Sequence, residues 1–181
     1  RITSIKSFFR WLEEGGVLLV NPAEKIVQKS IMSPIPTILW PHEVKKVIDA
    51  AEKFRYAEKP DIRHFMLVRL LLTTGIKKGE CLNLTLNHID FESPKGPMLY
   101  VRYANPQYRY KERNIPITDD WVDAYQEYEA EFELTDRLFP WSPRRLEYLL
   151  EDLSDEAEFD KHLSFDMCRW TCSLIDWDVG M

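Results

Sequence analysis

Residues 71–84 read LLTTGIKKGECLNL, and this stretch joins two predicted helices. The first helix, at 61–73, is apolar almost throughout, so we expect it at the centre of a hydrophobic core. Gly75 follows it, as glycine commonly follows a helix end. A second helix begins near Lys78-Gly79-Glu80. It is expected to bury Leu82 together with either Leu84 or Leu86.

The rest of the chain predicts a mainly α fold with a small antiparallel β-sheet, an α+β class. Residues 98–103 and 108–117 are rich in strand formers, and Asn105-Pro106 between them predicts a turn. Apolar residues at helical spacing and helix-start signals predict the remaining elements. These helices are 3–15, a short piece after Asn21-Pro22, 41–57, 119–133, 143–153 and 164–177.

Two prolines two residues apart predict a linker. Residues 30–37 read SIMSPIPT, and this spacing of prolines is incompatible with a helix. We therefore expect a domain boundary near residue 34. Residues 1–33 would be the end of one helical domain plus the linker, and residues 34–181 a second domain.

The charge is unevenly distributed along the chain. The net charge is −6, but residues 119–160 hold fifteen acidic and three basic residues, whereas residues 1–118 hold nineteen basic and twelve acidic ones. Such asymmetry permits a basic face and a separate acidic face. A nucleic-acid partner is therefore compatible with the overall negative charge.

Cysteine content and hydropathy bear on the compartment. The three cysteines, Cys81, Cys168 and Cys172, form no disulfide-like framework, and the four histidines are scattered. Buried free thiols in a reducing, cytoplasmic compartment are expected, with no metal site. No apolar run approaches the length of a membrane span, so no membrane association is expected.

Further segments bear on function. Residues 111–117 read KERNIPI, 138–141 read LFPW, and 163–172 read LSFDMCRWTC, followed by Gly180-Met181. These segments resemble the tyrosine recombinases of the phage-integrase family in their order and spacing. The resemblance also includes residues 71–84, His88-Ile89-Asp90 and, upstream, Phe8-Phe9-Arg10-Trp11-Leu12 and Asn21-Pro22. The resemblance implies a truncated recombinase catalytic domain, preceded by the end of a DNA-clamping domain. Its partner would be double-stranded DNA, with self-association on the DNA as an open option and no cofactor.

The resemblance assigns four residues to the catalytic site. Lys77 occupies the position of the family's first arginine, Glu80 that of a carboxylate, Asp166 that of a histidine, and Arg169 that of the second arginine. Two guanidinium groups can hold the non-bridging oxygens of a phosphodiester in a bidentate manner and stabilise the charge that attack creates. Lysine keeps the charge of arginine but loses this planar grip.

The hairpin carries the expected DNA contacts. The resemblance implies a lysine in this hairpin that protonates the leaving oxygen, but the family's spacing, counted back from Arg113, falls on Tyr108. Arg109 and Lys111 are the nearest cations. We therefore expect Lys78, Tyr108, Arg109, Lys111 and Arg113 to bind DNA.

The nucleophile is the part of the pattern that is missing. In the family, a tyrosine hydroxyl attacks the phosphate, and its position would fall beyond Met181. None of the eight tyrosines follows Arg169. Whether this chain belongs to an enzyme is therefore open: the parent family breaks and rejoins DNA, but the 181 residues alone are predicted to be inactive.

Each assignment has a structural alternative. Lys77 and Lys78 would suit a solvated helix start, and Glu80 would suit a helix cap. Arg169 would pair with Asp166 one turn earlier. Trp170 and Trp177 are expected in the core. The site hypothesis instead requires Lys77, Glu80 and Arg169 to converge on one basic face, away from the acidic helix that begins at Asp119.

Two rival functions remain. A degenerate relative would bind DNA without cutting it. A helical protein–protein interaction domain would use the acidic stretch 119–160 as its working surface.

Overall fold

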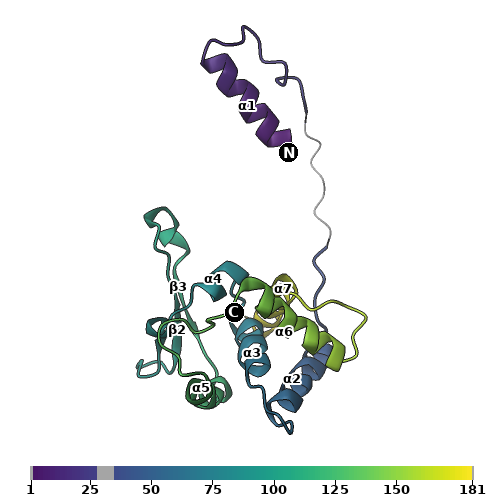
Figure 1. Ribbon diagram of the computed structural model, residues 1–181, viewed down its shortest axis with the longest axis vertical. Coiled ribbons are helices and arrows are strands. Elements are labelled where there is room, and N and C mark those ends of the chain that lie inside the picture. Colours follow the sequence, from purple (N-terminus) through teal and green to yellow (C-terminus); the bar gives the residue numbers. More distant parts are fainter. Residues whose placement is uncertain (1, 28–34, 181) are drawn as a thin grey trace. The chain divides into compact units, whose positions relative to one another are not determined.

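A computed structural model describes residues 2–27 and 35–180, in two compact units, Arg1–Ile35 and Pro36–Met181 (Figure 1). Most of the predicted linker, residues 30–37, lies outside the described residues. Within those residues, no helix is both long and apolar enough to cross a membrane.

The first unit consists of one helix and a turn. Helix α1 (Ile2–Glu14) buries none of its residues and exposes Phe8 and Trp11. The helix expected after Asn21-Pro22 is wrong, because the chain there forms a turn. The Asn21 side chain accepts a hydrogen bond from the Ala23 amide at 2.9 Å, and this local bond competes with a helix.

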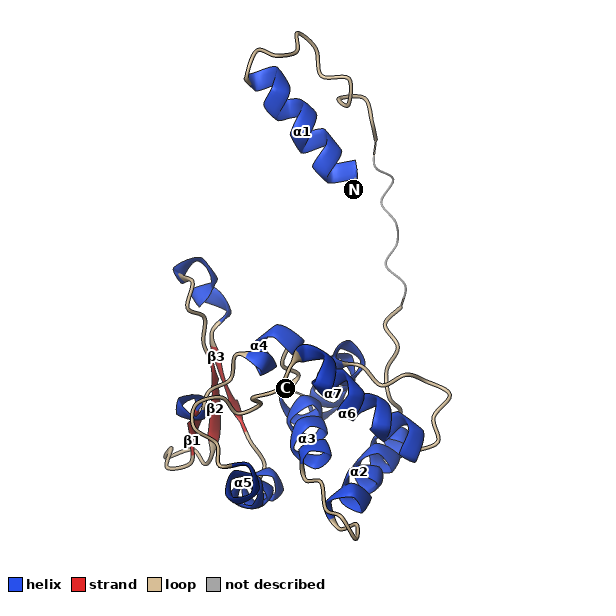
Figure 2. Cartoon of the chain, in the orientation of Figure 1, coloured by secondary structure: helices blue, strands red, loops and turns tan. Residues whose placement is uncertain are grey.

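The second unit is built around helix α3 (Arg63–Thr74), as its apolar sequence predicts (Figure 2). It packs against α2 (Pro41–Arg55), α5 (Asp119–Phe132), α6 (Pro143–Glu156) and α7 (Phe165–Val179). The indole N–H of Trp121 donates to the Met66 carbonyl at 3.1 Å, so α5 is fixed to α3 by a buried hydrogen bond.

A three-stranded antiparallel sheet follows the short helix α4 (Lys78–Leu82). The strand order is β1 (Ile89–Asp90), β2 (Met98–Val101) and β3 (Arg113–Pro116), with Leu99 opposite Ile89 on one side and Ile115 on the other. The pairing of β2 with β3 was predicted, whereas β1 was not. Leu84, at 2% exposure, is the buried member of the Leu84/Leu86 pair.

The return strand is shorter than predicted. Residues 106–111 form the 3₁₀ helix η2 (Pro106–Lys111), so the expectation of a strand over 108–117 is wrong for its first half. The Asn105 side chain accepts the Gln107 amide at 3.0 Å, and the Asn105 carbonyl accepts the Tyr108 amide. These local bonds, with Pro106 fixing φ, favour a helical turn over strand pairing.

Helix α7 is tied to the segment that leads into α2. The buried Leu39 amide donates to the Thr171 hydroxyl oxygen at 2.9 Å, and that hydroxyl donates to the Met167 carbonyl. Two tryptophans of α7 face solvent: Trp170 is 43% and Trp177 77% exposed, so the expectation that they lie in the core is wrong.

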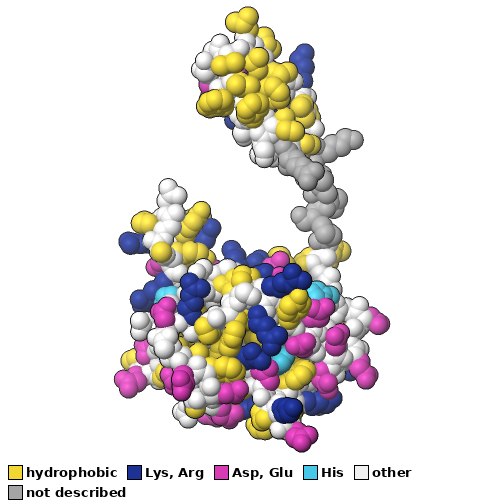
Figure 3. All heavy atoms as spheres, in the orientation of Figure 1, with side chains coloured by type: hydrophobic (Ala, Val, Ile, Leu, Met, Phe, Trp, Pro, Cys, Tyr) yellow, Lys and Arg dark blue, Asp and Glu magenta, His cyan; other side chains and the backbone are white. Residues whose placement is uncertain are grey.

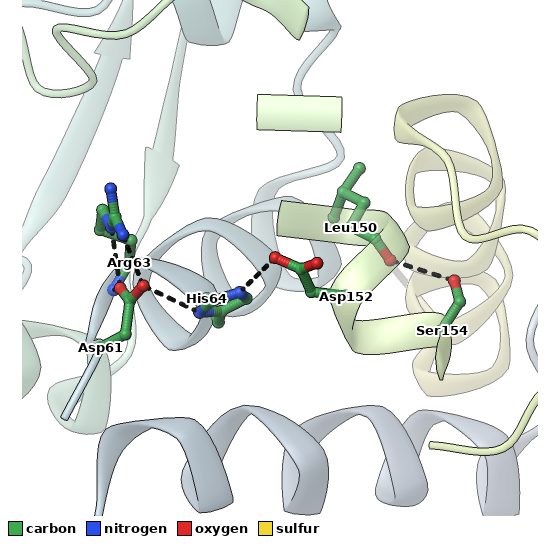
Figure 4. A network of polar contacts seen from close by, with 6 residues as sticks. All are labelled: Asp61, Arg63, His64, Leu150, Asp152 and Ser154. Carbon is green, nitrogen blue, oxygen red and sulfur yellow. Dashed lines mark hydrogen bonds and ion pairs between the residues drawn. The ribbon is translucent and has the colours of Figure 1, made fainter. Parts of the chain in front are cut away.

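A polar network crosses the helical core beside α3 (Figure 4). The buried His64 ring lies between the carboxylates of Asp61, at 3.6 Å from Nδ1, and Asp152, at 3.2 Å from Nε2. Arg63 holds Asp61 in place with two side-chain hydrogen bonds. The Ser154 hydroxyl donates to Leu150 and accepts from the Leu163 amide, which joins α6 to the segment before α7. The contact of His64 Nε2 with Asp152 links α3 to α6, whereas His64 Nδ1 is buried with no hydrogen-bond partner among the described residues and only the Asp61 carboxylate near it.

Candidate nucleic-acid interface

A groove of 1290 Å³ lies between α4 and the β2–β3 hairpin. Its lining carries five cationic side chains and two carboxylates; the cations are Lys77, Arg102, Arg109, Lys111 and Arg113. Figure 3 shows dark blue Lys and Arg side chains on the hairpin and beside it, and magenta carboxylates gathered toward the outer edges of the same unit. No residue of α5 lines the groove, in agreement with the expectation for the acidic helix.

Glu80 holds the groove together. Its carboxylate accepts two hydrogen bonds from the Arg113 guanidinium, at 3.0 and 2.8 Å, one from the Lys77 amide at 2.8 Å, and one from the Tyr103 hydroxyl. The Glu80 side chain is only 5% exposed and that of Arg113 37%. Glu80 therefore connects the start of α4 to both strands of the hairpin.

The same contacts set the ionisation of Glu80. Burial alone would raise its pKa, but the hydrogen bonds from Arg113, Lys77 and Tyr103 outweigh burial and hold the pKa at about 2. The carboxylate in turn raises the pKa of Arg113. Glu80 is thus a carboxylate at neutral pH, with both oxygens occupied. Glu112, the other carboxylate of the groove, accepts the Tyr103 amide at 3.0 Å.

The tip of the hairpin combines cations with aromatic rings. The Lys111 ammonium lies 4.7 Å from the centroid of the Tyr108 ring and 5.2 Å from that of Tyr110. Tyr108 is 44% exposed and meets Tyr103 edge-on at 6.0 Å. Tyr108, Arg109 and Lys111 therefore lie on η2 and line the groove, although they do not lie on the predicted strand.

Arg169 lies on the first half of α7, paired as its spacing predicts. Its Nη1 is 3.7 Å from Oδ1 of Asp166, whose side chain is 82% exposed. Gly75 packs against the same helix: a Cβ at Gly75 would lie 3.3 Å from Cys172 Sγ and 3.7 Å from Arg169 Cγ. The segment just before Lys77 therefore passes close to Arg169, although Arg169 is not among the residues that line the groove.

Lys78 points elsewhere. Its ammonium pairs with Glu147 of α6 at 2.6 Å, and it lines a separate pocket of 190 Å³ that also contains Asp166. Of the predicted site residues, the groove thus brings together Lys77, Glu80, Tyr108, Arg109, Lys111 and Arg113. Lys78, Asp166 and Arg169 lie outside its lining.

Tyr103, His88 and Arg102 line the groove but were not among the predicted site residues. Tyr103 binds Glu80, and His88 and Arg102 line the wall formed by η1 (Leu86–His88) and β2. Local sequence patterns could not reveal the bond between Tyr103 and Glu80, because the two residues are 23 positions apart.

The chain is similar in fold to solved structures of recombinases and integrases. The XerH recombinase in a post-cleavage complex with a palindromic difH substrate matches with a TM-score of 0.76 at 17% identity, over 95% of this chain and 53% of that one. A λ integrase dimer bound to a COC′ core site matches with a TM-score of 0.71 at 13% identity, over 99% and 66%. The fold is therefore that of the catalytic domain of tyrosine recombinases.

Sequence comparison places the chain in a family. The model of the phage integrase family matches residues 38–175, and the chain belongs to this family of tyrosine recombinases. A tyrosine recombinase of Thermosipho africanus is 30% identical over 127 residues, which are 70% of this chain and 41% of the relative. Tyrosine recombinase XerC of Roseiflexus castenholzii is 27% identical over 128 residues, 71% of this chain and 38% of the relative. The chain thus spans about two fifths of the length of these relatives.

Proposed function

We propose that this chain is the DNA-binding portion of a tyrosine-type site-specific recombinase, whose whole protein breaks and rejoins DNA strands. The observation that carries the proposal is the groove between α4 and the hairpin, with five cations against two carboxylates. Duplex DNA is the proposed partner, and it is supported by the solved complexes of XerH with a difH substrate and of λ integrase with a COC′ core site. With this partner, the protein would be associated with DNA in the cytoplasm.

The charge of Glu80 opposes phosphate binding little, because Arg113 already neutralises it in an ion pair. Glu80 is fully engaged by Arg113, Tyr103 and Lys77, and Glu112 accepts the Tyr103 amide. Arg113 keeps 37% of its side chain exposed. Lys77, Arg109 and Lys111 then provide positive charge that no carboxylate of the described residues neutralises by an ion pair. An arrangement of this kind attracts the DNA backbone and positions it without reading its sequence.

The roles proposed for individual residues follow from these contacts. Glu80 positions Arg113 and the hairpin. Phosphates of the DNA backbone in the groove contact Lys77, Arg109 and Lys111. Arg169 is proposed to grip the scissile phosphate once the phosphate displaces Asp166. In this scheme α1, with Phe8 and Trp11 exposed, belongs to the end of a clamp domain within residues 1–33.

A non-catalytic relative is the second candidate. The exposed pair of Asp166 and Arg169 favours it, since a carboxylate beside the phosphate site opposes the substrate's charge. Both candidates bind DNA, so DNA binding separates them from a protein–protein interaction domain.

Fluorescence anisotropy with a labelled duplex at several salt concentrations tests the proposal. Affinity should fall steeply with salt, and Lys77→Gln, Arg109→Gln and Lys111→Gln should each weaken binding and reduce the log–log salt slope by about 0.9. Lys46→Gln is the matched control, because Lys46 is an exposed cation on α2 that does not line the groove. DNA affinity that does not depend on salt would overturn the proposal. So would a loss of affinity in Lys46→Gln equal to that in the groove variants.

A further inference from the structure

One wall of the groove contains a histidine whose ring orientation is fixed by the backbone. The amide of Thr85 donates a hydrogen bond to Nδ1 of His88 at 3.2 Å. The His88 amide donates in turn to the Thr85 carbonyl at 3.0 Å. These reciprocal bonds close the single turn of η1 and hold the imidazole against the backbone on its Nδ1 edge.

The neighbouring backbone is anchored as well. The Leu86 amide donates to the Asp136 carbonyl at 2.9 Å, and the Leu138 amide donates to the Leu84 carbonyl at 3.0 Å. The start of the turn that carries His88 is therefore attached by two hydrogen bonds to the segment between α5 and α6. A ring mounted in this way is preorganised rather than free to rotate.

The hydrogen bond to Nδ1 determines which nitrogen of the neutral His88 ring carries the proton. Nδ1 can accept the Thr85 N–H only when it is unprotonated, so the neutral ring carries its proton on Nε2. Burial and the nearby Arg102 both lower the pKa of His88, which keeps the ring neutral at physiological pH. Nε2–H is a donor without a hydrogen-bond partner among the residues that the structure describes, and the ring lines the groove together with Arg102.

We infer that His88 is a DNA-contacting residue of this groove, whose neutral Nε2–H donates a hydrogen bond to a phosphodiester oxygen beside Arg102. The inference rests on the proposed function, because the groove must bind DNA. Arg102 lines the same wall and supplies the charge that attracts a phosphate to this point. The contact of His88 itself is uncharged, so it releases no counterion when DNA binds.

Two substitutions separate the two edges of the ring. His88→Asn places an amide oxygen near the position of Nδ1, which retains the acceptor for Thr85 and removes the groove donor. His88→Gln reaches the position of Nε2 with an amide N–H, which retains the donor and loses the acceptor. A structural role alone would make His88→Gln the more damaging change for DNA binding as well as for folding.

Anisotropy titrations at pH 8, with a thermal melt of each variant, test the inference. His88→Asn should melt like the unsubstituted chain and bind about threefold to tenfold more weakly, as expected for one lost hydrogen bond, with an unchanged salt slope. His88→Gln should melt at a lower temperature and bind more tightly than His88→Asn. Unchanged affinity of His88→Asn, or a salt slope reduced by about one, would overturn the inference.

The two proposals fail in different ways. If the unsubstituted chain binds in a salt-dependent manner and Lys77→Gln weakens it, while His88→Asn does not, the inference about His88 is wrong and the proposed function stands. If the unsubstituted chain does not bind the duplex, both are wrong.

Discussion

Replacing Glu80 with glutamine should destabilise the second unit in a pH-dependent manner. Glutamine keeps the shape of the side chain, but its amide nitrogen cannot accept a hydrogen bond from Arg113. The bidentate contact at 3.0 and 2.8 Å would therefore be broken, and the half-buried Arg113 would lose its counter-charge.

The magnitude follows from the ionisation of Glu80. A pKa of about 2 in the folded chain, against an ordinary 4.5, corresponds to about 3 kcal/mol. Solvent screens part of this interaction because Arg113 is 37% exposed, so we expect a loss of about 2 kcal/mol at pH 7. The folded-state pKa is the lower one, so this stability is complete above pH 4.5 and is lost as the pH falls toward 2.

Urea denaturation followed by circular dichroism, in steps from neutral pH down to about pH 3, measures this loss. The unfolding free energies of the unsubstituted chain and Glu80→Gln should differ at pH 7 and converge as the pH falls below 4.5. Glu147→Gln is the control: it removes the partner of Lys78 in an exposed ion pair and should have little effect. An equal deficit of Glu80→Gln at every pH, or no deficit at pH 7, would refute the reasoning.

Three further predictions concern the helices around the site. Gly75→Ala should destabilise the chain by about 1–2 kcal/mol in thermal melts, because φ at Gly75 is +56° and the new Cβ would lie 3.3 Å from Cys172 Sγ. Gly79→Ala is the control and should show no loss of stability, because Gly79 has open space around it and a helical backbone. Equal effects of the two substitutions would contradict this account. Asp166→Asn should free Arg169 from its ion pair and tighten DNA binding about twofold to fivefold at low salt. Stability should change little, since Asp166 is 82% exposed. Weaker DNA binding in anisotropy titrations would contradict this prediction. The 181-residue chain should form no covalent adduct with nicked suicide substrates on denaturing gels, because no tyrosine follows Arg169, and an adduct would show that one of the eight tyrosines acts from another position.

The parts of the fold that depend on local patterns were predictable. The apolar sequence of α3 predicted its central position, and the spacing of Asp166 and Arg169 predicted their ion pair. The bond between Glu80 and Arg113 was not, because 33 residues separate them and only the fold brings them together. The 3₁₀ helix at the hairpin tip was missed because strand propensity was weighed without the hydrogen bonds of Asn105.

The bond between Leu39 and Thr171 gives α7 a mechanical connection to the preceding chain. The Leu39 amide is held 2.9 Å from a hydroxyl that lies two residues beyond Arg169 on the same helix. A displacement of the chain at Leu39 would therefore strain this buried hydrogen bond and, with it, the position of α7. Leu39 is itself part of the hydrophobic core, so the Thr171 hydroxyl adds a directional attachment to that packing two residues beyond Arg169.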